Sequence, residues 1–342
     1  MTCQVTVLPS GHTFGVEAHE TILEAALRQN IGLPYGCRDG ACGACKGKVV
    51  AGEVSQDGFQ DKALPESERI QGMALFCCAK PQGDISIEVR EVTGAGDIQI
   101  KTLPCRVEKI EKIHDVAVLK LKLPVSERLQ FRAGQYIDIL MKDGKKRSFS
   151  IANAPHDDAF IELHIRHNPG GSFSDYVFNQ MKEREIMRFK GPLGSFFLRE
   201  DSDKPAIFIA SGTGFAPVKG IIEHAIHQGI QRQMVIYWGA RTLADLYMAP
   251  LAGSWQAAHP HITFIPVLSE ALPEDNWQGR VGFVHQAVLE DFADLSGYQV
   301  YACGAPVMVE AAHASFTGER GLPEDEFFSD AFLPSKDANA AK

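Results

Sequence analysis

Four of the eight cysteines constrain this chain more than any other feature, because their spacing is that of a metal centre. Cys37, Cys42 and Cys45 lie in one short loop, and Cys77, next to Cys78, follows at a distance. A Cys-x4-Cys-x2-Cys run with a remote fourth cysteine is the plant-type spacing for a 2Fe–2S cluster. Glycines within the loop let the backbone approach the sulfur atoms closely. The spacing therefore predicts a cluster and leaves open which adjacent cysteine is the fourth ligand.

A zinc site and uncommitted free cysteines are the alternative interpretations. Zinc sites usually join two Cys-x2-Cys pairs, whereas this loop combines three cysteines with one remote thiol. The N-terminus, MTCQVTVLPSGHTF, has no basic region followed by an apolar stretch, so we expect no signal peptide and a cytoplasmic protein. Disulfides are a poor explanation for clustered cysteines in such a reducing compartment.

The bulk composition argues against two other classes of protein. A formal net charge of −9 disfavours a nucleic-acid binder, which needs a basic face. No apolar run is long enough to cross a bilayer, so we expect no membrane insertion. A length of 342 residues exceeds what one compact core usually holds and indicates two or three domains.

The sequence pattern changes along the chain. In the first unit, Thr21 and Glu24 have capping-box spacing for a helix through Gln29. Short strands with glycine and proline punctuation then predict an antiparallel β-barrel, interrupted by one helix at 174–181. Beyond it, strands alternate with glycine turns and helices, which predicts a doubly wound parallel sheet with helices at 217–227, 243–251 and 284–292. The predicted parts are a cysteine-loop domain at 1–91, a linker at 92–103, a barrel at 104–200, a parallel-sheet domain at 201–334 and a disordered tail at 335–342.

Two motifs in the predicted barrel suit a flavin. The run Arg147-Ser148-Phe149-Ser150 offers an arginine to clamp a pyrophosphate, an aromatic ring to stack and a hydroxyl to bond flavin N5. Alone it is an unremarkable strand. It gains weight from Gly171, Ser172 and Ser174 at a predicted helix start, where backbone amides and small side chains suit a phosphate.

A glycine turn in the parallel-sheet domain suits a dinucleotide. Gly212, Thr213 and Gly214 follow a predicted strand, and Pro217 begins the next helix. The turn matches neither the Gly-x-Gly-x-x-Gly fingerprint nor a Walker loop. It does occupy the position after a parallel strand where a pyrophosphate is expected.

Together these motifs resemble the ferredoxin–NADP reductase superfamily, whose flavin motif is Arg-x-Tyr-Ser, with Phe149 here replacing the tyrosine. The resemblance implies FAD, and it places His164 and Arg166 on a strand that supplies flavin contacts. Solvent-facing strand residues are the alternative for both. It also implies that the Cys303-Gly304 turn lies beside the nicotinamide, where Cys303 positions the ring; the alternative is a buried strand-end cysteine.

The same resemblance assigns the C-terminal segment and the choice of nucleotide. Phe332 is expected to cover the flavin face and Asp330 to relay a proton, with simple packing of a final strand as the alternative. Glu270 stands where NADP-using members place an arginine, which favours NADH. Arg241 is a counterargument, because a nearby arginine serves NADPH, which we regard as the less favoured donor.

Over residues 1–334 the chain is similar to reductases with an N-terminal plant-type ferredoxin domain, including phenol hydroxylase-type oxygenase reductases and the CDP-deoxyglucoseen reductase branch. This implies a β-grasp first domain, with Cys77 as the fourth ligand. It also implies transfer from NADH through FAD and the 2Fe–2S cluster to a partner, either an iron–sulfur dehydratase of sugar-nucleotide deoxygenation or an oxygenase component. A free-flavin or ferric reductase and a non-catalytic electron carrier or redox sensor are the alternatives.

Overall fold

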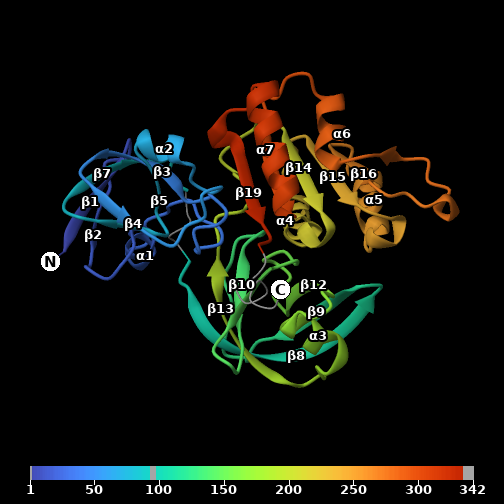
Figure 1. Ribbon diagram of the computed structural model, residues 1–342. Coiled ribbons are helices and arrows are strands. Elements are labelled where there is room, and N and C mark those ends of the chain that lie inside the picture. The colour runs from blue at the N-terminus through green and yellow to red at the C-terminus, as the bar shows by residue number, and fades with distance from the viewer. Residues whose placement is uncertain (1, 93–97, 334–342) are drawn as a thin grey trace. The chain divides into compact units, whose positions relative to one another are not determined.

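The computed structural model describes residues 2–92 and 98–333. The chain divides into two compact units, Met1–Gln99 and Ile100–Lys342, which are described separately (Figure 1). The predicted disordered tail at 335–342 and the centre of the predicted linker lie outside the described residues.

The first unit is a β-grasp domain. Its sheet has the order β2-β1-β7-β3-β5, in which β1 and β7 are parallel and the other pairs are antiparallel. Helix α1 (Ile22–Arg28) contacts β2 and buries Ile22, Leu23, Ala25 and Ala26. The strands are β1 (Cys3–Leu8), β2 (Thr13–Val16), β3 (Lys46–Ala51), β5 (Met73–Leu75) and β7 (Ile85–Glu88), beside a small sheet of β4 (Val54–Gln56) and β6 (Ala79–Pro81) and a short exposed helix α2 (Glu66–Ile70).

The start of α1 confirms the predicted capping box. The Glu24 amide donates to Thr21 Oγ1 at 3.2 Å, and the Thr21 amide donates to Glu24 Oε2 at 2.9 Å. These two bonds satisfy N–H groups that lack partners within the helix, and such a cap stabilises a helix by about 1 kcal/mol.

The second unit begins with the antiparallel barrel. Its six strands have the order β11-β10-β13-β8-β9-β12, and a bridge between Ile151 and Leu163 joins the two outer strands and closes the barrel. The strands are β8 (Lys101–Ile113), β9 (Val116–Lys122), β10 (Tyr136–Leu140), β11 (Lys146–Ser150), β12 (Ile161–Arg166) and β13 (Ile186–Leu193). Strand β8 starts inside the predicted linker, because Lys101 and the residues after it pair with β13.

The remainder of the second unit is a parallel sheet of order β17-β16-β15-β14-β18-β19 (Figure 1). Its strands are β14 (Ala206–Ser211), β15 (Met234–Ala240), β16 (Ile262–Leu268), β17 (Arg280–Val281), β18 (Gln299–Gly304) and β19 (Phe327–Ala331). The strand order reverses between β14 and β18, and ligands of doubly wound sheets bind at such a switch point.

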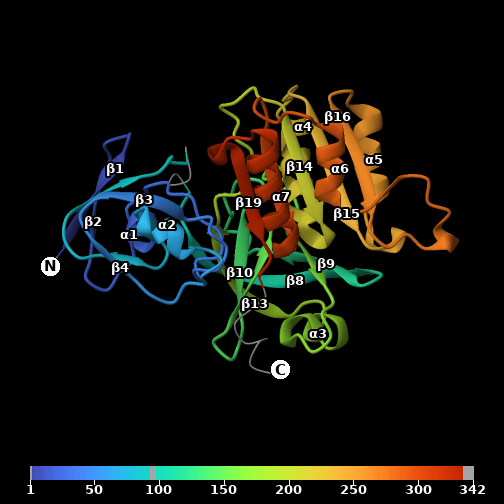
Figure 2. The ribbon, with the colours of Figure 1, turned by 45° about the horizontal axis from the view of Figure 1, so that its top comes forward.

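Helices cover both faces of this sheet, α4 (Phe215–His227) and α5 (Ala249–Ala258) on one and α6 (Val284–Asp291) and α7 (Pro306–Arg320) on the other (Figure 2). Strand β14 shows why: Phe208 and Ala210 join the core under α4 and α5, whereas Ile207 and Ile209 join the core under α6 and α7. Side chains of a strand alternate between faces, so a strand covered on both sides is apolar throughout.

Two predicted helices differ in the structure. Helix α3 (Ser172–Asn179) begins two residues before its predicted start, because Gly171 is its N-cap. The helix predicted at 243–251 is wrong. The segment forms a short 3₁₀ turn, Leu243–Asp245, and α5 begins only at Ala249. Asp245 is bonded by the Thr242 amide at 3.0 Å, which caps the short turn, and Pro250 fits a helix start but not a helix interior.

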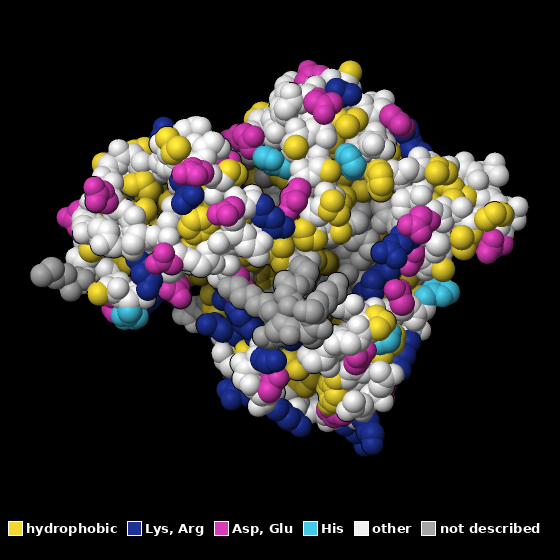
Figure 3. Space-filling model, viewed as in Figure 1, with side chains coloured by type: hydrophobic (Ala, Val, Ile, Leu, Met, Phe, Trp, Pro, Cys, Tyr) yellow, Lys and Arg dark blue, Asp and Glu magenta, His cyan; other side chains and the backbone are white. Residues whose placement is uncertain are grey.

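No helix among the described residues combines the length and apolarity that crossing a membrane requires. On the face drawn in Figure 3, acidic and basic side chains lie interspersed.

Candidate functional site

The cysteine loop brings backbone amides to its thiols. The Cys37 amide donates to Cys42 Sγ and the Asp39 amide to Cys37 Sγ, each at 3.4 Å. Gly40 has a φ of +70°, and a Cβ there would lie 2.7 Å from Cys78 Sγ, so only glycine fits. The backbone of the loop therefore follows the positions of the cysteine sulfur atoms closely.

The four predicted ligands interact as two linked pairs. The hydrogen bond from Cys42, assisted by nearby backbone amides, lowers the pKa of Cys37 to about 6 despite its burial. The side chain of Cys45 raises the pKa of Cys77 to about 12, and the charge of Cys37 acts on Cys77 too. These four free thiols interact with one another and have backbone N–H donors nearby, an arrangement that fits a plant-type 2Fe–2S cluster. Cys78 Sγ lies 3.6 Å from Cys77 Sγ, so the choice of Cys77 as the fourth ligand stays a prediction.

The two flavin motifs meet in the barrel. Arg147 on β11 donates through Nη2 to Ser172 Oγ at the start of α3, at 3.4 Å. No side chain caps this helix, and a Cβ on Gly171 would lie 2.8 Å from the Asn168 carbonyl oxygen. An arginine beside an uncapped helix start fits a pyrophosphate.

The other residues of these motifs make contacts of their own. The Phe149 ring lies 5.3 Å from the Phe173 ring, and Ser174 Oγ donates to the Asn168 carbonyl at 2.9 Å. Ser148 Oγ donates to Asp138 Oδ1 at 2.6 Å, so its predicted cofactor contact stays a prediction.

The nucleotide turn packs directly against the Cys303-Gly304 turn at the switch point. A Cβ on Gly214 would lie 2.2 Å from the Cys303 carbonyl oxygen, and one on Gly304 would lie 2.4 Å from Ser211 Oγ. Gly304 also has a φ of +126°, a conformation that only glycine adopts without strain. The two turns can approach this closely only because both positions lack a side chain. Pro217, in the first turn of α4, is buried beneath them.

The predicted catalytic residues converge at this point from both halves of the second unit. Asp330 pairs with Cys303 across β18 and β19, and Ser150 of the barrel donates through Oγ to Asp330 Oδ2 at 3.3 Å. The Phe332 amide donates to the Gly304 carbonyl at 2.8 Å. Burial, helped by the charge of Asp330, raises the pKa of the Cys303 thiol, so this cysteine is neutral and suited to positioning.

Arg166 lies at the nucleotide turn. Its Nη1 forms ion pairs of 3.0 Å with Asp115 and Asp245. Its Nε and Nη2 are buried with no hydrogen-bond partner among the described residues, and the guanidinium lies 3.8 Å from where a Gly212 Cβ would be. Two buried unpaired donors beside this turn fit an anionic group of a dinucleotide better than a flavin ring.

His164 is enclosed in the protein. Its side chain is 0% exposed, and its ring nitrogens contact Tyr247 Oη at 2.8 Å and Glu162 Oε1 at 3.0 Å. With both nitrogens engaged, a structural role is favoured over the predicted flavin contact. The contact with Tyr247 had no sequence signal, because Tyr247 lies far along the chain in a segment predicted to be helical.

Arg241 and Glu270 follow adjacent parallel strands, β15 and β16. The Glu270 amide donates to the Arg241 carbonyl at 2.8 Å, so the two residues lie side by side with exposed side chains. Their charges therefore lie close together at the ends of these two strands.

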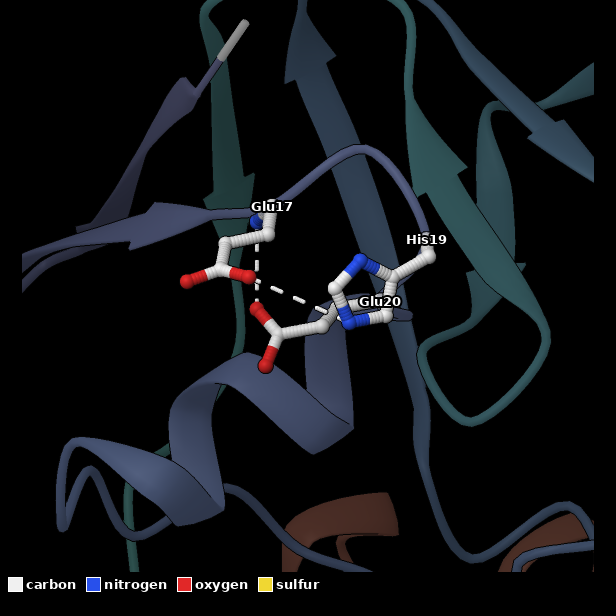
Figure 4. Close-up of side chains that lie close together, drawn as sticks. All are labelled: Glu17, His19 and Glu20. Atoms are coloured by element: carbon white, nitrogen blue, oxygen red, sulfur yellow. Dashed lines mark hydrogen bonds and ion pairs between the residues drawn. The ribbon is translucent and has the colours of Figure 1, made fainter.

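A cluster of Glu17, His19 and Glu20 has ligand atoms close enough for a cation (Figure 4). Arg28 already neutralises Glu20 through two hydrogen bonds of 2.7 Å, which lower the pKa of Glu20 to about 2. We assign no metal to this cluster.

Comparisons with known proteins match all three parts of the chain. Residues 5–82 match the 2Fe-2S iron-sulfur cluster binding domain, 104–198 the oxidoreductase FAD-binding domain and 208–314 the oxidoreductase NAD-binding domain.

Two curated relatives cover nearly the whole chain. A CDP-6-deoxy-L-threo-D-glycero-4-hexulose-3-dehydrase reductase of Yersinia pestis is 45% identical over 98% of this chain and 100% of its own length. The phenol hydroxylase P5 protein of Acinetobacter pittii is 36% identical over 100% of this chain and 98% of its own length. Among solved structures, an Amycolatopsis cytochrome P450 reductase matches with a TM-score of 0.77 and 33% identity, covering 97% of this chain and 99% of that one.

These matches confirm the predicted fold class and the predicted set of cofactors, a 2Fe–2S cluster, FAD and NAD. The chain belongs to the family of iron–sulfur flavoprotein reductases in which one polypeptide carries a ferredoxin-type domain, an FAD-binding barrel and an NAD-binding domain.

Proposed function

We propose that this reductase oxidises NADH and delivers the electrons through FAD and a cluster on Cys37, Cys42, Cys45 and Cys77 to a partner protein in the cytoplasm. The observation that carries the proposal is the convergence of the barrel's Ser150 with Asp330 at the switch point of the parallel sheet. A hydride donor and its acceptor must lie about 3–3.5 Å apart, so the two binding domains have to meet there.

When bound, the nicotinamide supplies a hydride, and the flavin divides its two electrons into the single electrons that a 2Fe–2S cluster accepts. The chain's own residues bind and orient. Arg147 and the start of α3 would hold the FAD pyrophosphate, and the Ser150 hydroxyl, which donates to Asp330 in this structure, would turn to donate to the flavin ring when FAD is bound. Cys303 fixes the approach of the nicotinamide, Phe332 excludes water from the flavin face, and Asp330 holds a proton beside Ser150.

The nucleotide preference rests on Glu270 and Arg241. A carboxylate accepts from the ribose hydroxyl of NADH and repels the additional phosphate of NADPH. The neighbouring Arg241 offsets part of this repulsion. NADH is therefore the preferred donor by a modest margin.

The partner class follows from the relatives. A dehydrase that acts on a nucleotide-linked deoxyhexulose is the first candidate, because the 45% identical relative is named for that reaction. An oxygenase component is the second candidate, supported by the phenol hydroxylase protein at 36% identity.

We also propose domain boundaries at 1–91, 104–200 and 201–334 with a linker at 92–103. The family matches, at 5–82, 104–198 and 208–314, fall within these ranges. The barrel strand β8 begins at Lys101, which shortens the part of the linker without regular structure.

Steady-state reduction of cytochrome c and of free FMN, each with NADH and with NADPH, tests this function. The proposal expects rapid cytochrome c reduction with NADH and slower reduction with NADPH. Rapid FMN reduction without cytochrome c reduction would instead identify a free-flavin reductase. Absence of NADH consumption with either acceptor would identify a carrier or sensor.

A further inference from the structure

A chain of buried and partly buried polar side chains crosses from the barrel to the parallel-sheet domain. Glu162 and His164 belong to β12, whereas Lys219 and Glu223 belong to α4 and Tyr247 to the segment after β15. Lys219 Nζ lies 3.1 Å from Glu162 Oε1 and 3.0 Å from Glu223 Oε2. Glu162 accepts from His164, which bonds Tyr247.

The chemistry of the groups fixes the direction of each bond. A carboxylate only accepts, so Nε2 of His164 carries the proton and donates to Glu162. Nδ1 of the neutral ring then accepts from the Tyr247 hydroxyl. Burial lowers the pKa of His164, which keeps the ring neutral. Burial alone would raise the pKa of Glu162, but the His164 bond and the Lys219 charge together lower it to about 2.

The other polar groups around this chain support the same state. Lys120 Nζ lies 3.7 Å from Glu162 Oε2, and Lys219 Nζ also donates to the Ala152 carbonyl at 3.3 Å. Removing one partner from a buried ion pair leaves an uncompensated buried charge, which strongly destabilises the folded protein. These polar side chains therefore keep their hydrogen bonds and ion pairs only while the barrel and the parallel-sheet domain hold their present alignment.

The far end of the chain reaches the nucleotide turn. The Tyr247 ring meets the Trp238 ring edge-on at 5.2 Å, and Trp238 stacks on Phe215 at 3.8 Å. Trp238 Nε1 donates to the Gly212 carbonyl at 3.0 Å. Phe215 opens α4 immediately after the turn. The barrel strand is thus connected through buried contacts to the backbone that is expected to hold the dinucleotide.

We propose that Glu162, His164 and Tyr247, anchored by Lys219, are positioning residues that set the nucleotide turn in register with the flavin strand. They touch neither substrate nor cofactor and act through the Gly212 backbone. This inference rests on the proposed function, because register matters only if a hydride passes between the two domains. Misplacing reacting groups by about 1 Å can cost roughly 100-fold in rate.

The test compares Tyr247→Phe with Tyr237→Phe in the full-length, FAD-loaded protein. Each change removes one tyrosine hydroxyl from a mostly buried ring, but Tyr237 donates to Asp291 on α6, away from the barrel, at 2.6 Å. The measurements are the anaerobic rate of flavin bleaching at saturating NADH, the Kd for NAD⁺, and hydrogen exchange at residues 212–215 without nucleotide.

Tyr247→Phe is expected to slow flavin bleaching by about 10-fold or more and to speed exchange at residues 212–215, with FAD content unchanged. Tyr237→Phe is expected to change neither quantity. Glu162→Gln is expected to reproduce the Tyr247→Phe result, with a larger loss of stability.

Equal effects of Tyr247→Phe and Tyr237→Phe on bleaching, or no effect of either, would overturn the positioning role and leave the proposed function standing. Loss of FAD from Tyr247→Phe would instead show that these polar side chains belong to the flavin site, which would also overturn the positioning role. Failure of NADH to bleach the wild-type flavin would refute the proposed function itself.

Discussion

The cysteine loop and the seam, where the barrel meets the parallel sheet at Ser150 and Asp330, both depend on glycine. They differ in how far apart in the sequence their residues lie. Cys37, Cys42 and Cys45 come from one loop, whose Gly40 makes room for a neighbouring sulfur. At the seam, Ser150 and Asp330 are 180 residues apart and meet only in the folded protein. The first site is visible as a spacing, whereas the second depends on the packing of two domains.

The largest effect is expected at the local site. Cys42→Ser removes a predicted cluster ligand, whose sulfur accepts from the Cys37 amide, so the 2Fe–2S cluster and cytochrome c reduction should be lost. NADH-driven flavin bleaching should persist, because the flavin site lies in the other unit. Iron content, cytochrome c reduction and flavin bleaching check this prediction.

Cys78→Ser is the matched control and should keep the cluster. If Cys78→Ser loses the cluster and Cys77→Ser does not, the fourth ligand is Cys78.

At the seam, Gly304→Ala is expected to slow NADH-driven flavin bleaching by about 100-fold while FAD stays bound. The added Cβ would lie 2.4 Å from Ser211 Oγ at a φ of +126°, which forces the two turns apart. Gly297→Ala is the control, because nothing lies within 4 Å of its Cβ position. Equal bleaching rates in the two variants would show that the contact between the turns does not shape the nicotinamide site.

Cys303→Ala should reduce the bleaching rate by about 10-fold through loss of positioning, at every pH. Burial raises the pKa of the wild-type thiol, so it stays protonated from pH 6 to 9. The ratio of wild-type to variant rates should therefore be flat across that range. A ratio that climbs toward pH 9 would point to a thiolate and contradict the positioning role.

The smallest effect is expected at the rim of the nucleotide site. Glu270→Ser should improve kcat/KM for NADPH by a few fold, because an exposed charge contributes about 1 kcal/mol or less. Raising the salt concentration should shrink the difference between wild type and variant. Glu274→Ser, another exposed carboxylate shortly after Glu270, is the control. No change in the NADH-to-NADPH ratio would show that Glu270 does not select the nucleotide.

Local chemistry explains which parts of the structure could be predicted from the sequence. The cap at Thr21 depends on residues that are neighbours in the chain, and it was predicted correctly. The helix predicted at 243–251 was wrong because, besides the local cap at Thr242 and the position of Pro250, distant contacts hold the segment: Asp245 pairs with Arg166 and Tyr247 with His164. Strands β3 to β6, β13 and β17 and helices α2 and α7 were not predicted.

The candidate site divides in the same way. The pairing of Arg147 with Ser172 and of Ser150 with Asp330 agrees with motifs taken from a family resemblance. The network of Glu162, His164 and Lys219 had no such motif, because ordinary Glu and Lys residues become informative only when folding buries them together.

Anaerobic titration with NADH, followed by visible absorption and low-temperature EPR, tests the central claim most directly. The account predicts flavin bleaching, followed by the rhombic signal of a reduced 2Fe–2S cluster, at lower concentrations of NADH than of NADPH. Flavin bleaching with no cluster signal would contradict electron transfer to the cysteine loop, and a protein purified without flavin would contradict the account as a whole.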